Sequence, residues 1–111
     1  MEDEKQIELQ RRVAQAVRAK EWTDTSAWGE LDLLSSNTAV DTVETFEQEV
    51  RIHHNEFDGP ITWHVTLEYG PKDGEGPLTT SESFPGTFQG HFDGEDPVVD
   101  DMTVDTTSFY A

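Results

Sequence analysis

Strict alternation of apolar and polar side chains over residues 61–69 is the clearest pattern in the chain. A period of two, with many β-branched and aromatic residues, indicates a strand that has one buried face. The side chains expected to point inward are Ile61, Trp63, Val65, Leu67 and Tyr69. Those expected on the opposite, polar face are Thr62, His64, Thr66 and Glu68.

The residues before this strand predict a β-hairpin. Residues 46–57 form the first arm, and Asp58, Gly59 and Pro60 follow as a turn signal. A loop at 57–60 sets Val50 opposite Leu67, so that the apolar residues of both arms share one face. Because a slip of one residue would mix the two faces, we expect this register.

Residues 1–20 predict an amphipathic helix, because their interior has no Gly or Pro and is rich in good helix formers. Glu8 and Arg12 have the spacing and order of a helical ion pair. The apolar face is thin, so the helix needs a surface to dock on. That surface is either the chain's own sheet or a second subunit, with which the helix pairs or is exchanged. The apolar face contains Leu9, Val13, Ala16 and Val17, with Ile7 and Ala14 at its margin.

Residues 21–45 give mixed signals. Asp24, Thr25 and Ser26 can cap a short helix that runs to Leu34, but residues 31–33 equally fit an edge strand. A turn cluster follows at 35–38. The only firm expectation is that the apolar side chains point inward, namely Trp28, Leu31 and Leu34.

The last third of the chain predicts further strands. Pro85 and Gly86 should break the first of them, and Gly90 indicates a bulge or close packing between the inward residues Phe88 and Phe92. Met102 should begin an alternation that continues to the C-terminal end. The expected segments are a loop at 70–77, strands at 78–84 and 87–92, a turn at 93–97 and a strand at 102–110.

These patterns together predict one α+β domain over residues 1–111, in which an N-terminal amphipathic helix packs on a four- to five-stranded antiparallel meander. Its parts are a helix at 1–20, an uncertain helix or loop region at 21–45, the hairpin at 46–69 and further strands at 78–110. The apolar face of the hairpin is bulkier than one thin helix can cover. We therefore predict a homodimer, the commonest closed assembly.

The charge is strongly acidic and unevenly placed. The 111 residues include 24 acids and 7 bases, a net charge of −17, and five of the seven bases lie within residues 1–20. Self-repulsion on a small core predicts marginal stability that salt increases, because the Debye length falls to about 3 Å near 1 M salt. We interpret the composition as salt adaptation; the alternative is an ordinary acidic protein of a high-GC mesophile or its phage.

Composition also excludes several classes. The absence of cysteine removes disulfides, thiolate metal sites and cysteine nucleophiles. The longest apolar runs are too short for a membrane span, and the first residues lack the features of a secretory signal. We therefore expect a cytoplasmic protein that does not bind membranes.

Two groups of residues are weak candidates for metal binding. The expected register sets His53 opposite His64 and places His54 beside Trp63, and two imidazoles with a nearby carboxylate such as Glu68 are possible zinc ligands. No third ligand is fixed, so a solvated pair is the simpler interpretation. The second group is a cluster of acids. Their spacing does not match that of an EF-hand calcium loop, so we interpret them as solvated surface charge. The cluster consists of Asp93, Glu95, Asp96, Asp100, Asp101 and Asp105.

No phosphate-binding loop or nucleophile elbow is present, so an enzyme is not the expected class, and no catalytic residue or cofactor is predicted. Direct nucleic-acid binding is disfavoured, because it depends on Lys and Arg. The leading hypothesis is a small acidic binding or assembly module without catalytic activity. The alternative is an acidic decoy, of a DNA-mimic, immunity or anti-defence type, for a DNA-binding protein. The third is a metal-binding protein or enzyme that uses His53 and His64.

Overall fold

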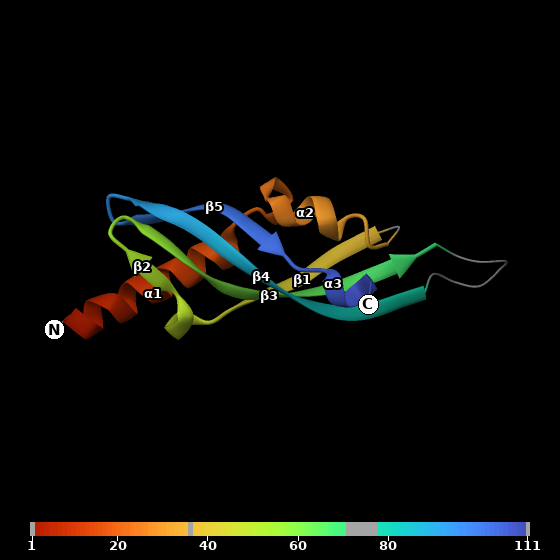
Figure 1. The fold of residues 1–111 in the computed structure, drawn as a ribbon, viewed down its shortest axis with the longest axis horizontal. Coiled ribbons are helices and arrows are strands. Elements are labelled where there is room, and N and C mark those ends of the chain that lie inside the picture. Colours follow the sequence, from red (N-terminus) through yellow and green to blue (C-terminus); the bar gives the residue numbers. More distant parts are fainter. Residues whose placement is uncertain (1, 36, 71–77, 111) are drawn as a thin grey trace.

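The computed structural model describes residues 2–35, 37–70 and 78–110. It confirms the predicted α+β fold, in which an N-terminal helix packs on an antiparallel sheet (Figure 1). The elements are α1 (Glu2–Ala19), η1 (Trp22–Asp24), α2 (Ser26–Leu31), β1 (Asn37–Thr45), η2 (Glu47–Glu49), β2 (Arg51–His53), β3 (Glu56–Tyr69), β4 (Leu78–Asp93), β5 (Asp96–Val104) and α3 (Thr107–Tyr110).

The sheet has the order β1-β3-β4-β5, and β2 also pairs with β3. Thr45 pairs with Ile61 and Arg51 pairs with Asp58, so β1 and β2 lie along the same side of β3. They are two pieces of one edge strand that the short helix η2 interrupts. The architecture is therefore the predicted meander, and it forms an elongated body with extents of 63 × 23 × 21 Å.

The inward face of β3 is the centre of the core, as its alternation predicts. Trp63 and Leu67 are 0% exposed, and the Trp63 indole N–H donates a 2.9 Å hydrogen bond to the carbonyl oxygen of Thr103. Helices α1 and α2 contribute Val13, Ala14, Val17, Ala27 and Leu31, which are all fully buried. One chain thus buries the apolar face that we expected to need a second subunit, and the homodimer stays a prediction.

The hairpin turn lies elsewhere than predicted. His53 pairs with Glu56, so the turn is formed by His54 and Asn55, and the predicted register is wrong. Gly59 lies inside β3, at a point where a Cβ would come within 2.8 Å of the Phe88 ring. Pro60 pairs with Thr87 of β4, and on its other side lies the interruption between β1 and β2, where no ladder N–H is needed.

Strand β4 does not break at Pro85 and Gly86, contrary to the prediction. Pro85 pairs with Thr62 and Gly86 with Ile61, so the strand is continuous. A Cβ on Gly86 would lie 2.1 Å from the carbonyl oxygen of Thr103, so this glycine permits close packing instead of a turn. The prediction for Gly90 is confirmed, because the register shifts between Gln89 and Gly90 and a Cβ there would meet the Val98 carbonyl oxygen.

The final strand begins and ends earlier than predicted. Strand β5 spans Asp96–Val104, and Thr107–Tyr110 forms the short helix α3 instead of continuing the strand. Because β5 already begins at Asp96, the turn before it is shorter than the predicted turn at 93–97. Gly94 in this turn has a φ of +66°. The expected loop at 70–77 lies outside the described residues except for Gly70.

The uncertain region forms the helical alternative, but α2 ends at Leu31 and not at Leu34, and residues 31–33 are not an edge strand. The turn cluster expected at 35–38 is wrong at its end, because β1 begins at Asn37. Thr25 is the N-cap residue of α2, but its hydroxyl bonds to the Trp22 carbonyl oxygen and does not cap the helix. Leu31 and Leu34 are buried as expected, and Trp28 is half-buried. Strand β1, which follows, was not predicted. None of the described helices is long and apolar enough to cross a membrane.

Candidate functional site

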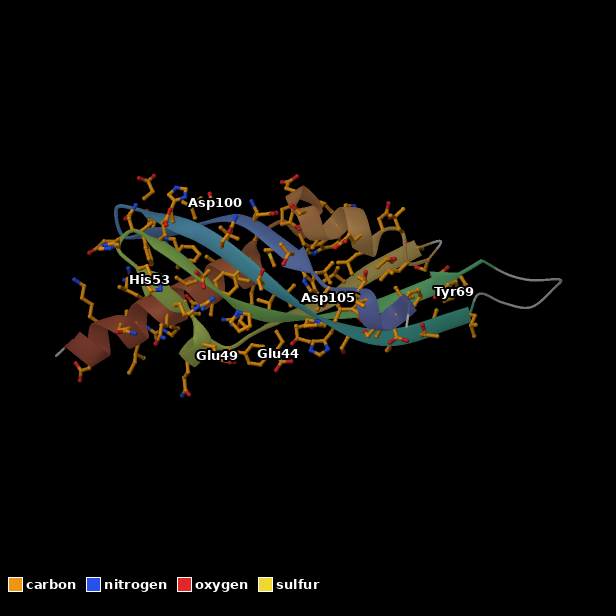
Figure 2. The ribbon with its side chains drawn as sticks, viewed as in Figure 1. Glu44, Glu49, His53, Tyr69, Asp100 and Asp105 are labelled. Carbon is orange, nitrogen blue, oxygen red and sulfur yellow. The ribbon has the colours of Figure 1, made fainter. Side chains whose placement is uncertain are left out.

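The face of the sheet opposite α1 is polar and partly exposed. Figure 2 labels three of its side chains, those of Glu44, His53 and Asp100. Its polarity follows from the alternation in β3, where the odd-numbered residues from Phe57 to Leu67 are buried and the even-numbered ones between them are half-buried. We call this surface the polar face. It carries Asp41 and Glu44 of β1, Arg51 and His53 of β2, Glu56, Asp58, Thr62, His64, Thr66 and Glu68 of β3, Ser81, Ser83, Gln89 and His91 of β4, and Asp100 of β5.

A chain of hydrogen bonds crosses three strands at the centre of the polar face. His64 Nε2 lies 2.8 Å from Glu44 Oε1, and His64 Nδ1 lies 2.8 Å from the Ser83 hydroxyl oxygen. When the neutral His64 ring donates its Nε2–H to Glu44, its Nδ1 accepts a hydrogen bond from the Ser83 hydroxyl. The result is the order hydroxyl, imidazole and carboxylate, in which the carboxylate orients the ring. His64 and Glu44 are 39% and 50% exposed, so water reaches the group.

The end of the polar face near the β4–β5 turn is more acidic. Glu56, Asp58, Gln89 and Asp100 line a cavity of about 210 Å³ together with Phe57 and Gly90. The Arg51 guanidinium bonds Asp58 Oδ1 through both Nε and a terminal nitrogen, each at 2.7 Å. This ion pair neutralises one of the carboxylates at the cavity.

His91 belongs to the same acidic end. Its Nδ1 lies 2.9 Å from Asp100 Oδ2. This hydrogen bond raises the pKa of His91 above the usual value of 6.5, and the charges of Asp100, Asp93 and Glu56 add to the effect. Protonation of His91 therefore partly offsets the negative charge around it.

The two histidines of the weak metal candidate do not face each other. His53 pairs with Glu56, whereas His64 pairs with Thr42 and Ser83. His54 is exposed in the turn, at a positive φ of 55°, and does not lie beside Trp63. Within the described ranges, no group of three or more His, Asp or Glu residues could hold a metal ion.

Three acids of the C-terminal cluster have hydrogen-bond partners in the chain that the sequence did not reveal. Asp100 bonds His91, as above. Asp101 accepts hydrogen bonds from the Ser26 N–H and hydroxyl at 2.8 and 2.6 Å, which caps α2 from β5. Burial raises the pKa of Asp101, but the bonds from Ser26 and Met102 outweigh it and the net shift is downward. Asp105 accepts a 2.9 Å hydrogen bond from the N–H of Thr107, the first residue of α3.

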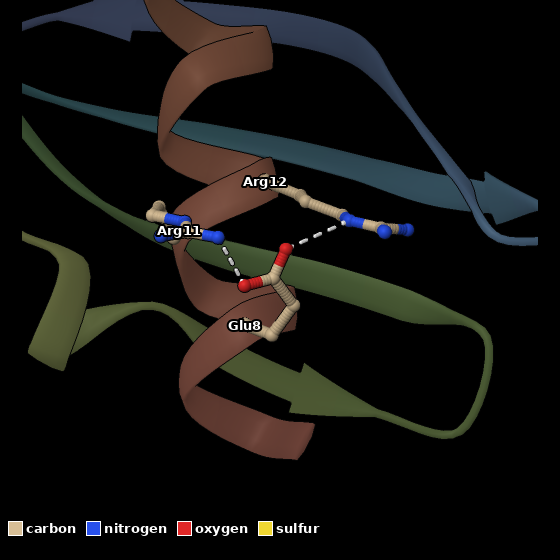
Figure 3. Close-up of polar contacts among 3 residues, drawn as sticks. All are labelled: Glu8, Arg11 and Arg12. Atoms are coloured by element: carbon tan, nitrogen blue, oxygen red, sulfur yellow. Dashed lines mark hydrogen bonds and ion pairs between the residues drawn. The ribbon is translucent and has the colours of Figure 1, made fainter. Parts of the chain in front are cut away.

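The bases of α1 lie on the other side of the molecule and are partly paired. Glu8 bonds both Arg11 and Arg12, with 3.3 Å between Glu8 Oε1 and Arg12 Nε (Figure 3). This confirms the predicted spacing, and the hydrogen bond from Arg11 lowers the pKa of Glu8. Arg18 donates a 2.6 Å bond to the Thr45 hydroxyl. Arg51 is therefore the only Lys or Arg that the described residues place on the polar face.

Comparison with known proteins gives one family. Residues 2–110 match a family model that is described as a predicted pPIWI-associating nuclease. No curated protein and no solved structure matches the chain.

Proposed function

The chain belongs to the family of predicted pPIWI-associating nucleases, and we propose that it is an acidic module that associates with a pPIWI protein through its polar face. The observation that supports this proposal is the charge of that face. Its carboxylates far outnumber its single Lys or Arg side chain, and that residue, Arg51, is already paired with Asp58. A surface of this kind binds a basic surface on its partner, and the attraction speeds association. In this proposal the chain contributes binding and not catalysis.

The experiment compares two variants that lose the same charge from different places. D41N/E44Q/E68Q removes three of the carboxylates of the polar face, and D24N/E30Q/D32N removes three exposed carboxylates around α2. Capture of the purified pPIWI protein should weaken at least tenfold for the first variant and change little for the second. Equal losses in both variants, or none in either, would contradict docking through the polar face.

Added duplex DNA refines the result. If DNA displaces the chain from the pPIWI protein, the polar face occupies a nucleic-acid site, as the decoy hypothesis requires. If DNA has no effect while D41N/E44Q/E68Q still weakens capture, the chain is an association module that leaves such a site free.

A second candidate function is hydrolysis, which the family description and the Ser83–His64–Glu44 chain favour. His64 is placed to take the proton of the Ser83 hydroxyl, with Glu44 holding the ring. Purified protein would then cleave single- or double-stranded nucleic acid, and H64Q and S83A would each abolish cleavage. Cleavage that survives in both variants would assign it to a contaminant or to other residues.

A further inference from the structure

The sheet has three stretches of open edge in the described residues. One is the outer side of β1 and β2, and another is the outer side of β5. The third lies on β4, because β5 ends at Val104, which pairs with Gly86. Beyond that point, residues 78–85 pair with β3 alone.

The first two edges carry features that hinder pairing with another strand. In β1 the register shifts between Val40 and Thr42, which marks a bulge at Asp41, and Glu44 adds a second charge. In β5, Pro97 removes a donor, and the register shift opposite Gln89 and Gly90 bends the strand. Bulges, charges and prolines are the usual protection of edge strands.

The β4 edge has little of this protection. Four of its eight side chains are the small hydroxyl residues Thr79, Thr80, Ser81 and Ser83. The others are Leu78, which is 64% exposed, the exposed acid Glu82, the buried Phe84 and, at the end next to β5, Pro85. No register shift occurs between residues 78 and 85. The Pro85 carbonyl oxygen accepts a 2.8 Å bond from the N–H of Asp105, so it points to this edge. Since strand residues alternate in direction, Thr79, Ser81 and Ser83 also direct their N–H and C=O groups outward.

We propose that a second copy of this chain pairs with the β4 edge, antiparallel and about a twofold axis at Ser81. In this register Ser81 faces Ser81 of the second copy, and Thr79 faces Ser83. Each of these is a pair of outward-directed residues, so it can exchange two hydrogen bonds. The polar faces of the two sheets become continuous, and Leu78 lies opposite the Phe84 position of the second copy.

Charge favours this edge over other surfaces for self-pairing. Each copy carries −17, so most surfaces repel a second copy. Across the proposed axis, Glu82 faces Thr80 of the second copy and no acid faces an acid. The remaining repulsion between the two bodies is long-ranged, and salt screens it. The pairing should therefore appear in molar KCl and weaken at low salt.

The test uses the fact that only the residue on the axis faces its own copy. Light scattering in molar KCl should give twice the 12.5 kDa chain mass for the natural protein and for S81N. S81D and S81K should each shift the dimer to monomer by at least tenfold in dissociation constant, because like charges would lie opposite each other. An equimolar mixture of S81D and S81K should restore the dimer.

The control variant T42D adds the same charge to the β1 edge and should leave the dimer intact. A 12.5 kDa species at every concentration in molar KCl overturns the proposal. So does a dimer that persists in S81D, or a mixture of S81D and S81K that stays monomeric. If the natural protein is monomeric and S81D weakens pPIWI capture, the edge binds a strand of that partner instead. Because the polar-face variants keep Ser81, failure of this proposal leaves the proposed function separately testable.

Discussion

The two faces of the sheet are formed by the same strands but differ in burial and in what they contribute to the protein. On one face Trp63, Leu67 and Met102 are fully buried under the helices. On the other, Thr62, His64 and Thr66 are half-exposed between the carboxylates of neighbouring strands. Apolar burial is the main favourable term in folding. The buried face therefore determines stability, and the polar face is free to carry the charge and hydrogen-bonding groups that a partner meets.

The largest expected effect comes from adjacent residues on opposite faces. Trp63→Ala removes a fully buried indole and its hydrogen bond to Thr103 and should destabilise the protein by about 3–5 kcal/mol. His64→Ala should cost less than about 1 kcal/mol, because its ring is partly exposed. Denaturant unfolding in molar KCl measures both. Similar losses for the two variants would show that the faces do not differ in this way.

Salt concentration changes the balance between carboxylate repulsion and apolar burial without any mutation. The folded state gathers carboxylates, and their repulsion is opposed mainly by the buried face. Dilution from molar to low KCl should lower the thermal midpoint by more than about ten degrees, which for a domain of this size is roughly 2 kcal/mol. Mild acidification at low salt should restore part of the loss. A midpoint that is the same at both salt concentrations would contradict this prediction and the interpretation of salt adaptation.

The next largest loss of stability is expected where two strands pack closely at a glycine. Gly90→Ala places a Cβ about 2.1 Å from the Val98 carbonyl oxygen and should destabilise the fold by about 1–3 kcal/mol. Gly29→Ala is the control, because nothing lies within 4 Å of a Cβ there and alanine favours helix α2. Thermal unfolding in molar KCl should separate the two variants. A neutral Gly90→Ala would show that β5 moves away easily.

The smallest effect is the pH dependence of the polar face. The pKa of His91 is raised in the folded protein by Asp100, so the folded state binds the proton more tightly than the unfolded state. Its contribution is fully present below pH 6.5, the unfolded value, and is lost as pH rises through the higher folded value. NMR titration should show His91 above 6.5, and His91→Gln should remove this slope from the thermal midpoint. Titration at or below 6.5 would contradict the contact with Asp100.

Periodicity predicted the parts of the fold that depend on burial. The alternation of β3 and the apolar stripe of α1 place Trp63, Leu67, Val13 and Val17 correctly in the core. Helix α2 adds Leu31 to the cover of the buried face, which the stripe of α1 alone does not supply. The sequence predicted that Leu31 and Leu34 point inward but left open whether they lie on a helix or a strand, because the local signals fit both.

Glycine and proline explain the main errors of register. Gly59 and Gly86 have the local signature of turns, yet each lies within a strand, at a point where another group approaches its Cα too closely for a side chain. Only the tertiary structure shows that the Phe88 ring and the Thr103 carbonyl oxygen lie there. The candidate site depended on the same register, so the sequence named His64 but not its partners Glu44 and Ser83.

The order of elements along the chain has a consequence for synthesis. Helix α1 is made before every strand, yet it packs against β1, η2 and β5. The cover of its inward residues Val13, Ala14 and Val17 is completed only after β5 has emerged, because β5 is the last of these elements to be made. For that interval the nascent chain exposes an apolar helix ahead of a growing acidic segment, which is the kind of surface that chaperones recognise.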